Sequence, residues 1–226
     1  MRLGFSGQDP NFPYIAEHQR FQFPNPEKSK DGVVAIGGNL SPGMLLSAYE
    51  QGVFPWYNPD EPVVWQSPDP RFVIFPEKLH VSTSMKKILN QRRFDVRFDS
   101  DFPAVIRECA AISRTGQNGT WITEDMINAY NELHRLGYAH CAESYAEGSL
   151  AGGCYGILLG SVFFGESMFS KQSNASKAAF VSFAKKLFAQ NVAFIDCQVW
   201  TAHLESLGGE RVSRCEFLKL LKENIR

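Results

Sequence analysis

Several features that would assign a chain to a common class of protein are missing from these 226 residues. No apolar run reaches the roughly 18 residues that a membrane-spanning helix needs, so neither a span nor a membrane partner is predicted. The five cysteines are scattered and none forms a C-x-x-C pair, which argues against a disulfide framework or a bound metal. Residues 1–5 lack the pattern of a signal peptide. These absences favour a cytoplasmic protein with reduced thiols.

The chain also lacks an excess of charge of either sign. It has 23 Lys and Arg against 24 Asp and Glu, a formal net charge of -1. Domains that bind nucleic acids are usually basic, so any contact with RNA has to come from a local patch. Phenylalanine is plentiful at 18 residues, and this predicts an aromatic-rich core or pocket.

The first third of the chain predicts a small domain of its own. Ser41-Pro42 predicts the start of a helix, because Ser is a good N-cap and Pro suits the first helical position, and Gly52 predicts its end. Four prolines follow between positions 59 and 70. Proline at this density is expected to exclude both helix and central strand. A domain boundary is therefore predicted near Arg71, with domains at 1–71 and 72–226.

The remainder predicts a mixed sheet with helices. Three strands, at 139–145, 149–158 and 161–167, are separated by short turns and so form an antiparallel meander. A helix over 174–190 and a strand over 192–199 come next. Shorter helices and strands flank this core, with strands at 72–75 and 95–98, helices at 82–90, 101–112 and 123–137, and further helices near 203–207 and from 214. The order β-β-β-α-β favours an α+β fold over a doubly wound one.

Glu166 is the first candidate for chemistry. It lies in a strongly apolar segment with Phe163, Phe164 and Phe169 close by. Burying a carboxylate is costly unless it meets a partner or a cation. Two interpretations stay open, a Glu that faces solvent by strand alternation and a carboxylate that recognises a cationic ligand.

Two further candidates flank the long predicted helix. Asn174–Lys177 opens it, with free N–H groups that could hold an anion, although a simple capped helix explains the same residues. Asp196 and Gln198 end the following strand and are predicted to share one face, either to orient an attacking amine or as a structural pair. Cys197 is predicted to point away as a small buried residue, and a Cys197–His203 pair is a weak alternative.

Aromatic and basic residues predict a nucleic-acid contact. Trp56, Trp65 and Trp121 lie on predicted loops, where they could stack unpaired bases or fill a contact between domains. Four cations gather around one helix end and could contact phosphates or form a solvated face: Lys86, Lys87, Arg92 and Arg93.

Taken in order, the motifs resemble those of the leucyl/phenylalanyl-tRNA–protein transferase family. The resemblance spans residues 32 to about 220 and is highly specific, because many long motifs occur in register. It rests on residues 32–42, 52–56, 67–71, 119–123, 152–156, 165–170, 174–177, 196–198 and 204–208.

The resemblance implies an aminoacyltransferase with a small N-terminal domain and an N-acetyltransferase-like C-terminal domain. The donor is expected to be Leu, Phe or Met on tRNA, and the acceptor a protein beginning with Arg or Lys, marked in this way for degradation. No cofactor is expected, since the donor ester is already activated. The chain is expected to act as a monomer.

The resemblance also implies roles for particular residues. The catalytic set it implies is Asp196, Gln198 and Glu166, with the first two as a proton-relay pair. The pocket for the donor side chain is formed by Phe163, Gly165, Met168, Cys154 and Phe183. Contacts to the terminal adenosine and the rest of the tRNA fall on Trp56, Trp121, Lys86, Lys87, Arg92 and Arg93.

Three rival functions fit the sequence less well. An acyl-CoA N-acetyltransferase would need a glycine-containing pyrophosphate loop before its central helix, and residues 169–175 carry no glycine. A binding-only tRNA module would leave Glu166, Asp196 and Gln198 unused. A Leu transferase for acidic N-termini fits poorly, because two carboxylates near the reaction centre favour a cationic acceptor.

Overall fold

The computed structural model describes residues 7–112 and 121–225, and within them two sheets. The smaller has the order β1-β3-β2 and is antiparallel, with β1 (Val33–Ile36), β2 (Phe54–Pro55) and β3 (Val64–Gln66). Its middle strand lies among the prolines, so the prediction that this stretch excludes a central strand was wrong. The reason is local: residues 63–67 contain no proline, and this short run suffices for a three-residue strand.

The larger sheet has seven strands in the order β10-β4-β9-β8-β7-β6-β5. All neighbours are antiparallel except β8 and β9, which are parallel. The strands are β4 (Arg71–Ile74), β5 (Asp95–Phe98), β6 (Ala139–Ala146), β7 (Ser149–Leu159), β8 (Val162–Ser170), β9 (Phe194–Asp196) and β10 (Glu210–Val212). The meander β6-β7-β8, then a helix, then a parallel strand confirms the predicted α+β class with an N-acetyltransferase-like sheet.

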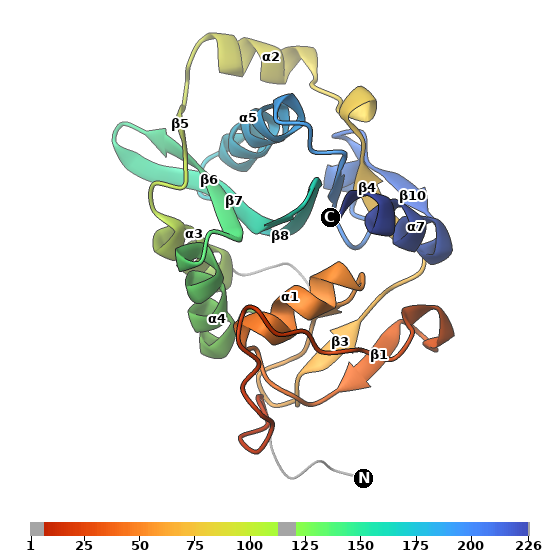
Figure 1. Ribbon diagram of the computed structural model, residues 1–226. Coiled ribbons are helices and arrows are strands. Elements are labelled where there is room, and N and C mark those ends of the chain that lie inside the picture. Colours follow the sequence, from red (N-terminus) through yellow and green to blue (C-terminus); the bar gives the residue numbers. More distant parts are fainter. Residues whose placement is uncertain (1–6, 113–120, 226) are drawn as a thin grey trace.

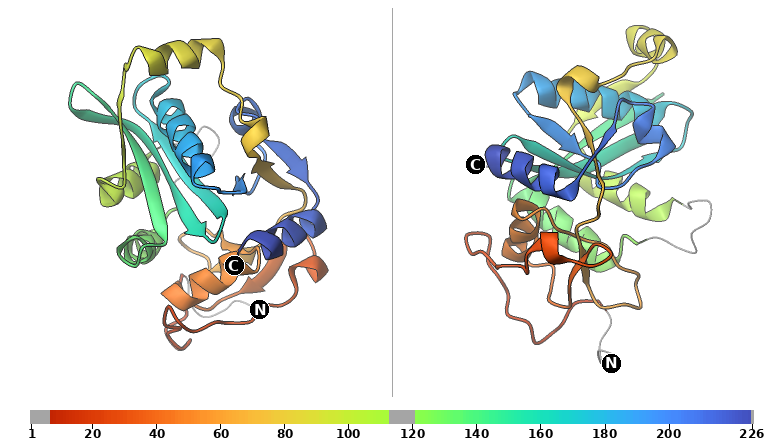
Figure 2. Two further views of the ribbon diagram at one scale, coloured as in Figure 1. Left: turned by 45° about the horizontal axis from the view of Figure 1, so that its top comes forward. Right: turned by 90° about the vertical axis from the view of Figure 1, so that its right-hand side faces the viewer.

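Helices cover both faces of this sheet (Figures 1 and 2). One face carries α5 (Ala175–Ala189), with α2 (Thr83–Asn90) outside it. The other face packs against α1 (Pro42–Glu50), α3 (Phe102–Ala111), α4 (Glu124–Arg135) and α7 (Arg214–Asn224). Two short 3-10 helices (Pro26–Lys28 and Pro76–Lys78) and α6 (Ala202–Glu205) complete the elements. Each face therefore has its own hydrophobic core.

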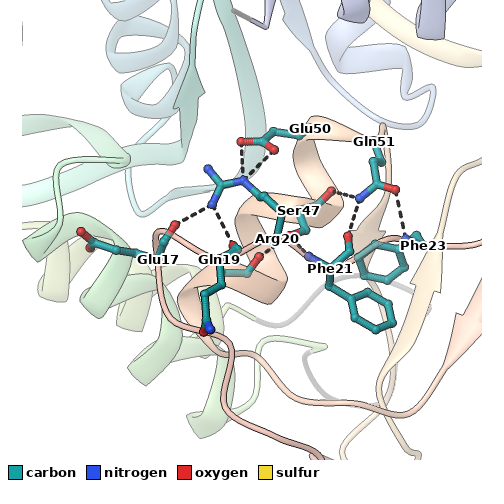
Figure 3. Close-up of polar contacts among 9 residues, drawn as sticks. Glu17, Gln19, Arg20, Phe21, Phe23, Ser47, Glu50 and Gln51 are labelled. Atoms are coloured by element: carbon teal, nitrogen blue, oxygen red, sulfur yellow. Dashed lines mark hydrogen bonds and ion pairs between the residues drawn. The ribbon is translucent and has the colours of Figure 1, made fainter.

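Helix α1 is apolar all round, and residues 42–49 are all buried, as expected for a helix enclosed by the fold. The N-terminal segment closes over it (Figure 3): Arg20 Nε donates to Glu50 at 2.8 and 2.9 Å, Phe21 N donates to Ser47 Oγ at 2.8 Å, and Gln51 Nε2 donates to Phe21 O at 2.8 Å. Ser41 does not cap α1 with its side chain as predicted. These contacts hold α1 between the segment and the larger sheet.

The strand predicted over 192–199 is much shorter, because β9 ends at Asp196. Gln198 has a φ of 63°, a left-handed conformation that an extended strand cannot contain. The chain turns at this point, beside the parallel pair β8 and β9, and the candidate site lies here.

Candidate active site

A cavity of about 370 Å³ opens at the ends of β8 and β9, and most of its walls are apolar. Ligand sites are usually hollows of this kind, with a few polar groups that fix orientation. Its lining residues are far apart in the sequence: Phe54, Pro55, Trp56, Trp121, Tyr155, Phe163, Gly165, Glu166, Ser167, Met168, Phe180, Cys197, Gln198, Val199, Thr201, His203 and Leu204.

Glu166 enters the cavity from a β-bulge. In the pairing of β7 with β8, Gly156 lies opposite Gly165 and Tyr155 opposite Ser167, so Glu166 is the extra residue. A bulge disturbs the alternation of a strand and re-aims the side chain it carries. Gly156 makes this possible, because a Cβ there would lie 2.1 Å from the Phe164 carbonyl oxygen. Glu166 is only 8% exposed, so the solvent-facing interpretation was wrong.

The Glu166 carboxylate accepts hydrogen bonds on both oxygens. Gln198 Nε2 donates to Oε1 at 2.7 Å, and the Tyr130 hydroxyl donates to Oε2 at 3.2 Å. Burial is the main cause that raises the pKa of Glu166, and the charge of the nearby Asp196 adds to it, while the hydroxyls of Tyr49 and Tyr130 and the Gln198 amide lower it; together they raise the pKa from 4.5 to about 7. Glu166 therefore changes charge near neutral pH.

The two tyrosines are site residues that sequence reasoning missed. Tyr49 of α1 and Tyr130 of α4 are fully buried, and their hydroxyls bond to one another in a chain that ends on Glu166. Burial and the Glu166 charge raise the pKa of both phenols, which stay protonated. Both appeared in the sequence only as apolar helix positions. A buried tyrosine hydroxyl needs a partner, but its partner becomes apparent only once the helices are packed.

Asp196 is held by Arg71 in a fully buried ion pair. Arg71 Nε and Nη2 donate to the two carboxylate oxygens at 2.9 and 2.7 Å, and neither side chain is exposed. The guanidinium also donates to Gly52 O at 3.1 Å and lies 4.8 and 4.3 Å from the ring centres of Phe54 and Phe217. A bidentate pair of this kind is strong and directional. It keeps the Asp196 carboxylate in place.

The predicted arrangement of Asp196 and Gln198 on one strand face was wrong, because the strand ends between them. The Asp196 side chain turns to Arg71, while the Gln198 amide turns to Glu166. The two residues still interact, since Gln198 N donates to Asp196 Oδ1 at 2.9 Å. Asp196 thus holds the backbone of Gln198 in the conformation that delivers its amide to the cavity.

Cys197 was predicted to face away from the site, but it lines the same cavity. It is buried, and burial together with the neighbouring Asp196 raises the pKa of its thiol well above the usual value. The thiol form predominates at neutral pH, and a thiol is a much poorer nucleophile than a thiolate.

The residues predicted for a donor pocket divide into two groups. Phe163, Gly165 and Met168 line the cavity. Cys154 and Phe183 lie behind the wall in the core under α5, and the Phe183 ring packs edge-on against Phe163 at 5.1 Å. The α5 residue at the wall is Phe180, which sequence reasoning did not select.

The three tryptophans predicted to contact RNA do not lie together. Trp56 and Trp121 line the cavity, and Trp56 is 37% exposed and stacks on Phe54. Residues 119 and 120 of the Trp121 motif lie outside the described part of the chain. Trp65 is fully buried, with Nε1 donating to Gly37 O at 2.8 Å, so it cannot stack on a base.

The four clustered cations are exposed at α2 and the turn after it, outside the cavity. They are Lys86, Lys87, Arg92 and Arg93. Helix α2 forms the outermost layer beyond α5 (Figure 1), so these side chains can meet a large ligand without rearrangement.

The start of α5 is partly occupied by the chain itself. Ser176 N donates to Ser170 Oγ at 3.3 Å, and Asn174 precedes the helix with a φ of 71°.

Among the described residues, no group of three or more His, Cys, Asp or Glu side chains is arranged to hold a metal ion. No helix in the described ranges is long and apolar enough to cross a membrane.

The strand order and this cavity define an α+β protein with a ligand-sized site beside its parallel strand pair, and comparison with known proteins identifies its family. The model of the leucyl/phenylalanyl-tRNA protein transferase family matches residues 73–222, and the model of that family's N-terminal domain matches residues 38–69. The chain therefore belongs to the leucyl/phenylalanyl-tRNA–protein transferase family, which is a family of aminoacyltransferases.

Individual relatives agree over almost the whole chain. A leucyl/phenylalanyl-tRNA–protein transferase of Syntrophus aciditrophicus is 51% identical over 197 residues, which is 87% of this chain and 82% of that protein. The one from Chromobacterium violaceum is 48% identical over 220 residues, 97% of this chain and 91% of that protein. Among solved structures, a GCN5-related N-acetyltransferase from Kribbella flavida is 8% identical with a TM-score of 0.35, covering 76% of this chain and 62% of that one. That last likeness is too low to support a functional argument.

Proposed function

We propose that this chain transfers Leu, Phe or Met from aminoacyl-tRNA to the N-terminal Arg or Lys of proteins and so marks them for degradation. The observation that carries the proposal is the cavity itself. An apolar wall suited to a donor side chain and a buried carboxylate suited to a cationic acceptor face the same space.

The part of the cavity that would bind the donor, called the donor end here, has an apolar group and an aromatic group of lining residues. Phe163, Met168 and Phe180 offer apolar surface for a branched or aromatic side chain, with Cys154 and Phe183 supporting them from behind. Trp56 and Trp121 offer aromatic faces on which the terminal adenosine can stack. We expect the exposed cations of α2 and the turn after it to contact phosphates further along the tRNA.

The acceptor end depends on Glu166. In its ionised form this carboxylate attracts the guanidinium or ammonium group of an N-terminal Arg or Lys. Glu166 is only 8% exposed, and salt screens such a buried charge much less than an exposed one. An acidic N-terminus would be repelled by the same charge. The carboxylate therefore selects the acceptor by its sign.

The chemistry needs alignment more than activation. The neutral α-amine of the acceptor attacks the ester carbonyl, the new amide bond forms, and the bond to the ribose oxygen breaks with a proton passing to that oxygen. An α-amino group has a pKa of roughly 8, so a fair fraction is neutral at pH 7. We expect Gln198 to orient the amine, and such positioning supplies much of the acceleration.

In this scheme Asp196 is not the proton acceptor. Its oxygens are occupied by Arg71 and by the Gln198 N–H, so we assign it a positioning role that acts through Gln198. In the proton-relay alternative, Asp196 would have to give up its pair with Arg71 at each turnover.

The test is transfer of labelled Leu from Leu-tRNA to peptides that begin with Arg, Lys, Asp or Ala. Modification of the Arg and Lys peptides, with none of the Asp peptide, is expected. Equal modification of the Asp peptide would overturn the acceptor assignment. With the acceptor held constant, Leu and Phe should transfer better than Val or Ala. The expected difference in rate is roughly 10–200-fold for each methylene by which two donor side chains differ.

We expect the reaction to take place in the cytoplasm, because its donor is a charged tRNA. A monomer remains the expected state of the chain.

A further inference from the structure

His203 is a polar residue of the cavity that the proposed chemistry does not employ. It lies in α6, lines the cavity, and its Nε2 is buried without a hydrogen-bond partner within the described part of the chain. Leaving such an atom unpaired is costly, because it has lost its hydrogen bonds to water without gaining a replacement. Native structures rarely keep a group of this kind without a use, and a ligand that enters the cavity can supply the missing partner.

The charge state of His203 limits which ligand group that can be. Burial and the nearby Lys177 lower the pKa of the imidazole, so the ring is neutral at neutral pH. A neutral imidazole accepts a hydrogen bond on one nitrogen and donates from the other. The positive charge of Lys177 also disfavours a guanidinium here, and Glu166 is the better partner for that group. A small, weakly charged hydrogen-bond donor suits Nε2.

His203 lies at the donor end of the cavity, because Leu204 follows it on α6, and Lys177, whose charge acts on the imidazole, is one turn before Phe180 on α5. Leu204, Met168 and Phe180 line the cavity with it and belong to the apolar wall that receives the donor side chain under the proposed function. The α-amino group and the ester carbonyl are attached to the carbon that bears this side chain. Only the amine can donate a hydrogen bond.

We infer that His203 Nε2 accepts a hydrogen bond from the free α-amino group of the donor aminoacyl ester, an inference that rests on the proposed function for the identity of the donor. His203 is thus a specificity-determining residue that favours an unblocked amino acid. The apolar wall binds the Leu side chain in the same way whether or not the donor has a free amine. The hydrogen bond to His203 forms only when the amine is free.

Binding of two stable donor analogues tests the inference without requiring transfer. One is 3′-leucylamido-3′-deoxyadenosine, and the other is its 4-methylpentanoyl counterpart, which lacks only the amine. Calorimetry on the wild-type protein is expected to show about tenfold tighter binding of the amine-bearing analogue, the size of one hydrogen bond. In His203→Leu the two should bind within about twofold of one another. His203→Gln, which restores an acceptor atom, should regain part of the preference.

Glu205→Ala is the matched control, because Glu205 is exposed on the same short helix and does not line the cavity. It should keep the wild-type preference, and thermal unfolding checks that each variant is folded. The inference is overturned if His203→Leu weakens both analogues equally, if it keeps the preference, or if the wild-type protein shows none. An equal loss would mean that Nε2 meets the ester carbonyl or the ribose instead. Failure of Leu transfer to Arg peptides, with amine-dependent binding intact, would overturn the proposed function and leave this contact standing.

Discussion

The Gln198 side chain donates a 2.7 Å hydrogen bond to Glu166, joining the segment that follows β9 to the bulge of β8. These two strands are the parallel pair of the sheet, and the bond spans the point where the cavity opens. Gln198 also receives its orientation from Asp196, through its backbone N–H. A line of contacts therefore runs from Arg71 through Asp196 and Gln198 to Glu166, and each member can be tested separately.

Asp196→Asn is expected to lower both stability and turnover. It leaves the Arg71 guanidinium buried without its counter-charge, and breaking a buried pair in this way costs about 3–5 kcal/mol. Urea unfolding measures the loss. Turnover should fall while donor binding stays nearly unchanged, because the interaction matters mainly in the transition state.

The double variant Arg71→Met/Asp196→Asn serves as the control for that loss. It removes the stranded charge and should recover part of the stability without recovering turnover. A stable Asp196→Asn with normal turnover would contradict the role given to the pair, and full activity of the double variant would show that neither residue positions Gln198.

Glu166→Gln should reduce acceptor selectivity. The substitution keeps the shape of the side chain and removes its charge. Transfer of Leu to Arg and Lys peptides should fall at least tenfold, and transfer to an Ala peptide should change much less. The ratio of kcat/KM for the Arg and Ala peptides is the measurement. An unchanged ratio would show that another group recognises the acceptor.

Tyr130→Phe should move the pH dependence of transfer upward. The hydroxyl donates to the Glu166 carboxylate and so lowers its pKa, which burial has raised to about 7. Without this donor the pKa rises further, so the ionised form that attracts a cationic acceptor appears only at higher pH. The rate with an Arg peptide rises with pH in both proteins, and its midpoint should be higher in the variant.

Tyr57→Phe provides the comparison, since Tyr57 is a buried tyrosine whose hydroxyl bonds to Thr123 instead. Its profile should match the wild type. The acceptor amine titrates in the same way with every variant. The pH profile of Glu166→Gln shows the contribution of the amine alone, because this variant has no carboxylate at position 166. A Tyr130→Phe profile that coincides with the wild type would exclude Glu166 as the titrating group.

Cys197→Ala should keep substantial activity although the residue lines the cavity. The raised thiol pKa leaves almost no thiolate at neutral pH, so a thioester intermediate is not expected. Single-turnover transfer, with folding checked by circular dichroism, gives the answer. A folded but inactive Cys197→Ala beside an active Asp196→Asn would require a mechanism through the thiol.

The double variant Lys87→Ala/Arg92→Ala should weaken binding of tRNA and reduce its dependence on salt. Each phosphate contact contributes roughly 0.7–0.9 to the slope of log affinity against log salt concentration, so losing two contacts should lower the slope by about 1 to 2. Lys219→Ala/Lys222→Ala on α7 is a control of equal charge. If only the control changes the slope, the tRNA lies along α7 instead.

Much of the fold could be predicted from the sequence, because it depends on local patterns. Strand β5 lies at the predicted residues, and the meander, α5 and the order β-β-β-α-β follow from hydrophobic periodicity with turns between the segments. Motifs in register identified the family. They also selected Glu166, Gln198 and the tryptophans Trp56 and Trp121, all of which line the cavity.

Only the tertiary structure decided which partner each polar side chain meets. Arg71 and Asp196 are 125 positions apart, and nothing local to either residue indicates their pairing. The bulge that turns Glu166 inward depends on the register between two strands. The tyrosine hydroxyls and the His203 ring have roles only because packing buries them beside particular neighbours. Periodicity is a property of a segment, whereas burial, charge pairing and a shifted pKa are properties of surroundings drawn from the whole chain.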